Sequence, residues 1–164
     1  MITLLRVDDR LIHGQVAMTW TSYLSANVIV VANDKYAKDP FLQMALNLAK
    51  PPGVALNIVT KDEAVKFCND PANDSSKIFI VVETTDDAVM MAENIPGIKE
   101  AVLGGIRKAE GRVQMERQVF LSRHDIDNAE KIDALGKKVS VQVVPSDKEL
   151  SLADMKKIYS RKSN

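Results

Sequence analysis

The runs Val-Ile-Val-Val-Ala at residues 28–32 and Lys-Ile-Phe-Ile-Val-Val at residues 77–82 are short, apolar and rich in β-branched side chains. Such runs are typical of strands buried on both faces of a parallel sheet. Between them lie longer stretches that open with helix-capping residues, such as Asp39-Pro40 and the capping box Thr60–Glu63. The alternation predicts an α/β fold in which right-handed crossovers place helices on both faces of the sheet.

The same pattern extends along the chain and assigns residues 1–164 to one domain. Strands are predicted at Ile2–Val7, Val28–Ala32, Ala55–Val59, Lys77–Val82, Ala101–Leu103, Gln118–Leu121 and Val139–Val144. Helices are predicted at residues 14–23, from Pro40, after Thr60, from about Thr85 to before Pro96, at 123–135 and at 152–159. In such folds ligands bind beyond the carboxyl ends of the strands, so the loops that follow the strands are the places to search for a site.

The composition argues against several classes of protein. The 22 Lys and Arg residues balance the 22 Asp and Glu residues, so charge favours neither nucleic acid nor an anionic membrane as a partner. A lone Cys68 excludes an internal disulfide framework, and the two histidines lack the spacing of metal ligands. No apolar run approaches the roughly 18 residues of a membrane span, and charged residues interrupt the N-terminus before a signal peptide can form. We therefore expect a cytoplasmic protein without a metal or another cofactor.

The loop after the first predicted strand carries the densest set of reactive side chains. It reads Val7-Asp8-Asp9-Arg10-Leu11-Ile12-His13-Gly14-Gln15 and leads into the first helix. The unpaired amides and the dipole at a helix start attract phosphate, Gly14 permits close approach of the backbone, and Arg10 offers a forked donor for phosphate oxygens. A neutral imidazole is a competent nucleophile towards phosphorus. The combination indicates that His13 is itself phosphorylated, with amides and Arg10 holding the new dianion.

A second interpretation of this loop stays open from the sequence. In it, His13 only caps the helix and Arg10 only pairs with Asp8 or Asp9. The two carboxylates would also repel a phosphoryl group, so at least one of them is expected to point away and to orient Arg10 or His13. Either carboxylate fits that role.

At this loop the chain resembles the IIB components of the mannose–fructose–sorbose family of the bacterial sugar phosphotransferase system. Residues Arg6–Val16 reproduce the family signature Arg-Ile/Val-Asp-Asp/Glu-Arg-Leu-Ile-His-Gly-Gln-Val, and Trp20 follows it. The likeness continues in order, without a large gap, through Val30–Asp34, Asp39-Pro40, Thr84-Thr85, Gly104-Gly105, Gly111-Arg112 and Val141–Pro145.

The resemblance implies a three-layer α/β/α fold with a mostly parallel sheet of about seven strands. It implies a protein-phosphohistidine–sugar phosphotransferase in which a IIA component donates a phosphoryl group to Nδ1 of His13. The group then passes to a sugar held by the membrane components IIC and IID, with which the cytoplasmic IIB protein associates peripherally. Arg10 matches the arginine that neutralises the phosphoryl group. The other phosphate-loop candidates are Asp9, Gly14, Gln15, Arg6, Thr84 and Thr85.

Several features stay open under this resemblance. Mannose, fructose, sorbose and N-acetylgalactosamine are all candidate sugars, with a slight preference for mannose or an amino sugar, and the chain is either a monomer or a homodimer. Val102 stands where many relatives have Asn, so any polar role of that side chain is absent. Leu11, Ile12, Met18 and Trp20 are candidates for an apolar rim where partner proteins dock, although Met18 and Trp20 also fit the core.

Two other functions compete with the relay. His13 can serve as the general base of a stand-alone hydrolase or isomerase, or its phosphorylation can be only a signal in a regulatory or interaction module. Genes for IIA, IIC and IID components beside this one would favour transport over both.

Overall fold

A seven-stranded sheet forms the centre of the protein. The computed structural model describes residues 1–163, and Asn164, the last residue of the predicted domain, lies outside the described part. The strand order is β3-β2-β4-β1-β5-β8-β9, and all neighbours pair in parallel except β9, which runs antiparallel to β8. The strands are β1 (Ile2–Asp8), β2 (Val28–Ala32), β3 (Ala55–Val59), β4 (Ile78–Val82), β5 (Glu100–Gly105), β8 (Lys138–Val141) and β9 (Leu150–Ser151). The mostly parallel sheet of seven strands is thus confirmed.

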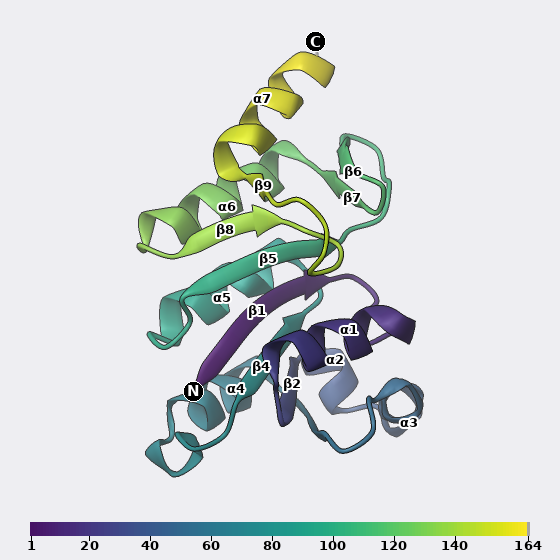
Figure 1. Cartoon of the computed structure of the whole chain (residues 1–164), viewed down its shortest axis with the longest axis vertical. Helices are drawn as coiled ribbons and strands as arrows, with labels where there is room; N and C mark the ends of the chain where they lie inside the picture. Colours follow the sequence, from purple (N-terminus) through teal and green to yellow (C-terminus); the bar gives the residue numbers. More distant parts are fainter. Residues whose placement is uncertain (164) are drawn as a thin grey trace.

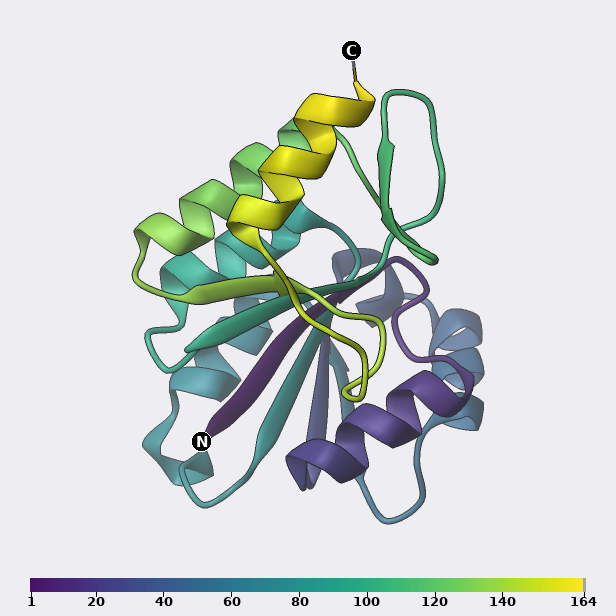
Figure 2. The same cartoon turned by 45° about the horizontal axis from the view of Figure 1, so that its top comes forward.

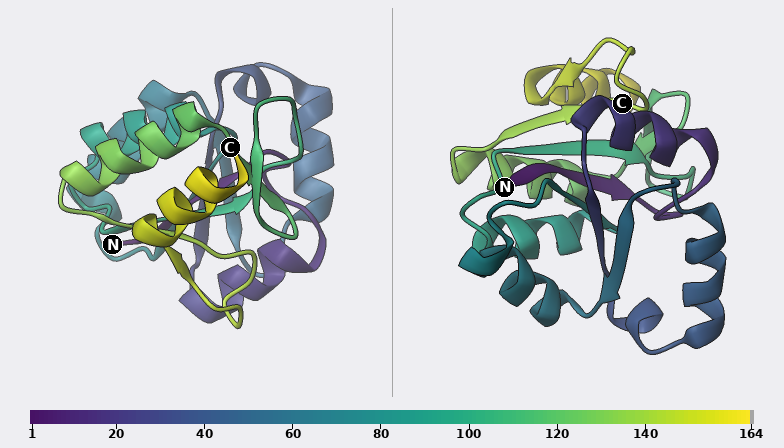
Figure 3. Two further views of the ribbon diagram at one scale, coloured as in Figure 1. Left: turned by 90° about the horizontal axis from the view of Figure 1, so that it is seen from above. Right: turned by 60° about the horizontal axis from the view of Figure 1, so that its bottom comes forward.

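Helices cover both faces of this sheet and complete the three predicted layers (Figures 1 and 2). The helix α1 lies on one face, whereas α4, α5 and α6 lie on the other (Figure 1). Seen from above, α7 packs along α6 (Figure 3), and its Lys162 Nζ donates to the carbonyl of Gln114 at 3.0 Å. The helices are α1 (Gly14–Leu24), α2 (Asp34–Ala37), α3 (Pro40–Ala49), α4 (Lys61–Asn69), α5 (Thr85–Asn94), α6 (Arg123–Ala134) and α7 (Leu152–Lys162), with a short 3-10 turn at Pro71–Asn73.

The core lies in two layers, one on each face of the sheet, because successive strand residues point to opposite sides. Towards α1 and α3 the sheet buries Leu4, Ile29, Val31, Phe79, Val81 and Val102. Towards α4, α5 and α6 it buries Leu5, Val7, Val30, Ile80, Val82 and Leu103. By the same alternation Arg6 and Asp8 share the face of Leu4. Two charged residues are therefore directed towards α1, beneath the loop that carries His13.

The prediction of Gln118–Leu121 as a strand of the main sheet is wrong. Residues Val119–Leu121 (β7) pair instead with Val113–Glu116 (β6) in an antiparallel hairpin. A bridge between Ile106, the residue after β5, and Val119 holds this hairpin beside the end of β5. The apolar side chains of this hairpin, Met115, Val119 and Leu121, are still buried in the core, so their pattern resembles that of a sheet strand. The seventh strand of the sheet is β9, which has only two residues and no apolar run.

Local interactions explain where the other elements begin and end. The predicted caps are confirmed: Asp39 accepts from the amides of Phe41 and Leu42, and Thr60 and Glu63 cap α4 reciprocally. The strand β8 ends at Val141, three residues before its predicted end, because the side chain of Gln142 donates to the carbonyls of Pro145 and Asp147 and closes a loop. Within residues 1–163, no helix is long and apolar enough to cross a membrane.

Candidate active site

A tight turn at the end of β1 brings His13 back against the strand that it follows. The amide of Leu11 donates to the carbonyl of Asp8 at 2.9 Å, and Leu11 adopts a left-handed φ of 60°. This conformation is strained for a residue with a Cβ, and burial of the Leu11 and Ile12 side chains offsets the strain. These two residues are therefore core residues, and the prediction that they form a docking rim is wrong. Trp20 is likewise buried, whereas Met18 is exposed.

The imidazole of His13 is held by Asp8. Its Nε2 lies 2.7 Å from Asp8 Oδ2, and the His13 side chain is 21% exposed whereas that of Asp8 is 1% exposed. An ionised carboxylate can only accept, so Nε2 carries the proton and Nδ1 keeps its lone pair. No group among residues 1–163 bonds to Nδ1. The pairing thus presents one defined nitrogen of His13 to an incoming group.

Asp8 is kept ionised by its surroundings. Burial alone would raise the pKa of the Asp8 carboxyl, but the hydrogen bond from His13, the charge of Arg6 and the amide of Arg10 together hold this pKa below its ordinary value. Arg6 Nη2 lies 3.3 Å from Asp8 Oδ2, and the Arg10 amide donates to Asp8 Oδ1 at 3.0 Å. Asp8, and not Asp9, is therefore the carboxylate that orients the histidine.

Arg6 is buried beneath the site and does not reach its surface. Its Nη1 donates to the carbonyl of Gln142 at 3.2 Å, and its guanidinium lies 5.4 Å from the ring centroid of Trp20. Trp20 Nε1 in turn donates to the carbonyl of Val143 at 2.8 Å. Arg6 is predicted as a phosphate ligand, but its side chain is buried and pairs with Asp8. Its charge therefore stabilises the Asp8 carboxylate and does not contact a phosphoryl group at the surface.

The glycine pair Gly104-Gly105 leaves room for this buried pair. A Cβ on Gly104 would overlap the guanidinium of Arg6, and a Cβ on Gly105 would lie 2.9 Å from the Asp8 carboxylate. Both glycines belong to β5 and not to the turn that the sequence suggested. Val102, two residues earlier, is buried among apolar side chains on the same face, where a lone amide group would need a partner.

The start of α1 directly follows His13, and Arg10 lies in the loop before it. Gly14 has a positive φ of 45°, and the amides of Gly14, Gln15 and Val16 have no acceptor within residues 1–163. The side chains of Arg10 and Gln15 are exposed, and they make no hydrogen bond or ion pair with any side chain or backbone group of residues 1–163. The amides that follow His13 are thus free to bind an anion, as phosphate binding requires, and the loop before it carries a guanidinium without a partner.

The alternative interpretation of the loop fails in two respects. His13 occupies the N-cap position of α1, but its side chain makes no capping hydrogen bond. Arg10 pairs with neither acid, because Asp8 binds Arg6 and Asp9 Oδ2 accepts from the amide and Nε of Arg107 at 2.9 and 3.1 Å. Asp9 is consequently directed away from His13, towards the loop after β5.

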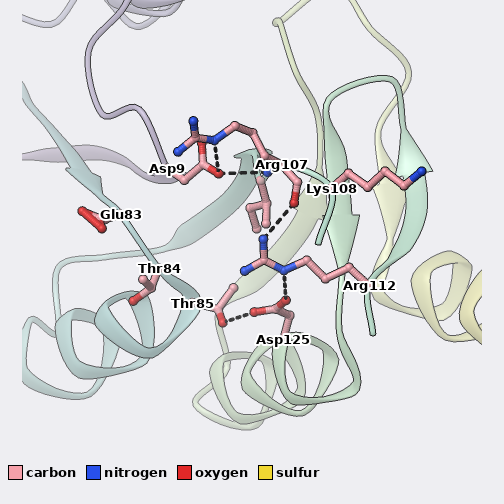
Figure 4. Close-up of a pocket in the computed structure, with 9 residues that line it drawn as sticks. Asp9, Glu83, Thr84, Thr85, Arg107, Lys108, Arg112 and Asp125 are labelled. Carbon is pink, nitrogen blue, oxygen red and sulfur yellow. Dashed lines mark hydrogen bonds and ion pairs between the residues drawn. The ribbon is translucent and has the colours of Figure 1, made fainter. Parts of the chain in front are cut away.

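Thr84 and Thr85 line a neighbouring hollow of about 510 Å³ that His13 does not line (Figure 4). The Thr85 hydroxyl is occupied: it donates to Asp125 Oδ1 at 2.6 Å and accepts from Asn128. Thr84 caps α5 by accepting from the amide of Asp87. Of the loop that carries His13, Asp9 thus shares this hollow with the two threonines, whereas His13 itself does not.

Three basic residues of this hollow, Arg107, Lys108 and Arg112, were not singled out from the sequence as a group. Only Arg107 directly follows a predicted strand, at the edge where sites are expected. The β6–β7 hairpin brings Arg112 back to this edge, and sequence spacing does not reveal that return. Residues 1–163 contain no cluster of three or more His, Cys, Asp or Glu side chains able to hold a metal ion.

The lowered pKa of Asp8 makes part of the stability depend on pH. Because the native pKa lies below the unfolded value of about 3.9, the contribution of Asp8 is complete above that pH and is lost as the pH falls through the native pKa. We expect the difference in unfolding free energy between the wild type and Asp8→Asn to narrow below about pH 4. Urea unfolding at a series of pH values measures this difference in unfolding free energy. A difference that does not change with pH would contradict the lowered pKa of Asp8.

Comparison with known proteins agrees with the geometry. A sequence model of the PTS system sorbose subfamily IIB component matches residues 2–164. The sorbose-specific EIIB component of Klebsiella pneumoniae is 33% identical over 153 residues, which cover 93% of each chain. The crystal structure of the IIBSor domain of the sorbose permease from Klebsiella pneumoniae superposes with a TM-score of 0.88 at 32% identity, covering 96% of this chain and 97% of that one.

A third relative joins two components in one chain. The mannose-specific EIIAB component of Escherichia coli strain K12 is 30% identical over 155 residues, which are 94% of this chain and 48% of that protein. The family match over nearly the whole chain agrees with the signature loop and with the fold. The chain belongs to the sorbose-subfamily IIB components of the sugar phosphotransferase system, which are phosphotransferases.

Proposed function

We propose that this chain accepts a phosphoryl group on Nδ1 of His13 from a IIA component and passes it to a sugar. The sugar, of the mannose, fructose, sorbose or N-acetylgalactosamine class, is held by the membrane components IIC and IID at the cytoplasmic face. The observation that carries the proposal is the 2.7 Å contact between Asp8 and Nε2 of His13, because it leaves the lone pair of Nδ1 unused on a partly exposed side chain.

The first transfer follows from this arrangement. The Nδ1 lone pair attacks phosphorus in line as the bond between phosphorus and the donor atom of the IIA component breaks. The ring then carries a phosphoryl group on Nδ1 and a proton on Nε2, and the Asp8 carboxylate stabilises its positive charge. The amides at the start of α1 and the guanidinium of Arg10 neutralise the phosphoryl oxygens.

The second transfer runs in the opposite sense at the same nitrogen. A sugar hydroxyl attacks phosphorus, the Nδ1–P bond breaks, and the hydroxyl proton leaves to a base on the sugar-binding component or to water. Asp8 holds the Nε2 proton throughout, so the ring returns to the tautomer in which it began. No group of this chain has to move for the ring to serve both transfers.

The proposed donor is supported by the domain arrangement of a relative. The Escherichia coli mannose-specific EIIAB component contains an A and a B component in one chain, which places a IIA domain beside a IIB domain. In this chain the partly exposed imidazole lies at an edge that a docking protein can reach.

Relay reconstitution tests the proposal. With phosphoenolpyruvate, the general carriers and the cognate IIA protein, we expect one acid-labile, base-stable phosphate per chain, and His13→Ala should abolish it. The matched control is His124→Ala, since His124 is exposed and, within residues 1–163, pairs with Asp86 alone. Label retained in His13→Ala would refute the proposal. Label that forms but never passes to any of the candidate sugars with their IIC and IID proteins would favour a signalling module.

Arg10→Ala should slow both transfers while leaving the fold intact. The side chain is exposed and makes no intramolecular bond within residues 1–163, so only the phosphoryl group loses a partner. A charge-assisted hydrogen bond of about 1.5–3 kcal/mol corresponds to a loss of about 10- to 100-fold in rate. Rapid-quench measurement of labelling gives this rate, Arg10→Lys should recover part of it, and an unchanged rate would show that Arg10 does not neutralise the phosphoryl group.

A further inference from the structure

The hollow beside the histidine loop has the position of a ligand site. It lies between the end of β4 and the loop after β5, with Asp9 on its wall (Figure 4). The chain leaves β1 towards α1 on one face of the sheet and leaves β4 towards α5 on the other (Figure 1). Crevices at such divergences are where ligands bind in open α/β sheets. The volume of about 510 Å³ is typical of small-molecule sites.

All three carboxylates in this hollow accept from protein donors, and two of them, Asp9 and Asp125, also pair with arginines. Asp9 Oδ2 accepts from Arg107, as described above. Asp125 Oδ1 accepts from Thr85, and its Oδ2 accepts from the amide and hydroxyl of Ser122 at 2.9 Å each. These bonds connect α5 to α6 and the loop after β1 to the loop after β5. The charges of Asp9 and Asp125 are offset by their ion pairs with Arg107 and Arg112.

Donors, by contrast, remain unused. Arg112 donates from Nη1 to the carbonyl of Arg107 at 2.8 Å and its Nε lies 3.9 Å from Asp125 Oδ2, while Arg107 donates from Nε to Asp9. The Nη2 group of Arg112 and both Nη groups of Arg107 have no acceptor within residues 1–163. Figure 4 shows the guanidinium of Arg112 directed into the hollow, while the ammonium of Lys108 points away from it. The first amides of α5, those of Thr85 and Asp86, also have no acceptor within residues 1–163. This part of the hollow suits a group with several acceptor oxygens and negative charge.

The opposite wall offers acceptors. Glu83 uses only Oε2, which accepts from Asn33 Nδ2 at 3.1 Å, and its Oε1 has no partner within residues 1–163. A carboxylate oxygen would repel a bare phosphate but accepts readily from a hydroxyl group. The hollow therefore pairs a cationic side with a hydroxyl-binding side.

We infer that this hollow binds a phosphate monoester of a small polyhydroxy compound, at a site separate from His13. The phosphoryl oxygens contact Arg112 and the first amides of α5, Arg107 contributes from the rim, and the hydroxyl groups reach Glu83. Nothing in this site depends on phosphorylation of His13, so its occupancy can be measured on the unphosphorylated protein.

NMR titration of the labelled full chain tests the inference with three probes: mannose-6-phosphate, inorganic phosphate and mannose. We expect mannose-6-phosphate to shift the amides of residues 84–86 and 106–112, inorganic phosphate to bind there more weakly, and mannose to leave them unchanged. His13→Ala should bind mannose-6-phosphate as the wild type does. Loss of the relay function would therefore leave this result intact, and the two proposals can fail separately.

Three outcomes would overturn the inference. The first is that neither mannose-6-phosphate nor inorganic phosphate shifts any amide. The second is a shift confined to residues 13–16, which would place the anion at the start of α1. The third is an equal affinity for mannose-6-phosphate and inorganic phosphate, which would remove the role of Glu83. Arg112→Ala should weaken binding of mannose-6-phosphate by about tenfold or more, because it removes a charge-assisted bond. Arg107→Ala serves as the second variant if Arg112→Ala unfolds.

Lys108→Ala is the matched control for these variants. Lys108 lies in the same loop, carries the same charge and contributes to the lining of the hollow, but its ammonium points away from it (Figure 4). The affinity should stay within about twofold of the wild type, since an exposed charge that does not face the ligand contributes little. If Lys108→Ala and Arg112→Ala lowered the affinity for mannose-6-phosphate equally, the effect would come from the overall charge of the protein. That result would contradict the assigned site.

Discussion

Gly104→Ala is expected to destabilise the protein by roughly 3–5 kcal/mol, although it adds a single methyl group. The new Cβ would overlap the guanidinium of Arg6. That guanidinium is buried between β5, Trp20 and Asp8. To make room for the methyl group, it has to move away from the Asp8 carboxylate. Separating a buried ion pair leaves two charges without compensation, which costs more than the overlap itself. Urea unfolding of Gly104→Ala against the wild type measures the loss.

Two comparisons isolate the cause of this loss. Gly97→Ala is the matched control, because its Cβ would lie 3.3 Å from the flexible side chain of Ile2 and nothing else; we expect a cost below about 1 kcal/mol. The second comparison is a double-mutant cycle with Arg6→Met. If the overlap with Arg6 is the cause, the two changes together should cost clearly less than their sum. Additive costs would mean that Gly104 is required for another reason.

Asp8→Asn is expected to lower the rate of phosphoryl transfer to His13 by about 10²–10⁴-fold. The carboxylate can only accept from Nε2, which fixes the tautomer with a free lone pair on Nδ1. An amide can instead donate to Nε2, and the ring proton then moves to Nδ1 and blocks the nucleophile. The amide also fails to stabilise the positive ring that carries the phosphoryl group. Rapid-quench labelling with the IIA donor measures the rate.

The control for Asp8→Asn is the same change one residue later. Asp9→Asn makes the same change at the neighbouring carboxylate of the loop, but Asp9 contacts Arg107 and not the histidine. We expect its transfer rate to remain within about tenfold of the wild type, since no contact with the reacting ring is lost. Because Asp8→Asn would also leave Arg6 without its charge partner, circular dichroism must show that this variant is folded under the assay conditions. Equal rates for both variants would remove Asp8 from the mechanism.

The fold was largely predictable because its strands are buried on both faces. Runs such as Val28–Ala32 and Ile78–Val82 need apolar residues at every position, and this signal is local. The cap residues Asp39 and Thr60 act within four residues of themselves, so they too can be identified in the sequence. The β6–β7 hairpin and β9 were missed, because their positions depend on tertiary packing and not on a local pattern.

The site was predictable in part. The signature loop around His13 and the amides of α1 follow from local order along the chain. The roles of Asp8 and Arg6 do not, since they depend on the turn at Leu11 and on Gly104 in a neighbouring strand, far away in the sequence. Leu11 and Ile12 are apolar, and apolar residues occur both in docking surfaces and in cores. The packing of the turn, which the sequence does not reveal, places their side chains in the core.

The nitrogen that bears the phosphoryl group is the most direct test of the account. Phosphorus and nitrogen NMR of the ring-labelled protein, phosphorylated by its IIA donor, distinguishes the two ring positions of His13. With Nε2 held by the buried carboxylate of Asp8, the phosphoryl signal should couple to Nδ1 alone, and the Nε2 proton should remain protected from exchange. A phosphoryl group on Nε2, or on any residue other than His13, would contradict the account.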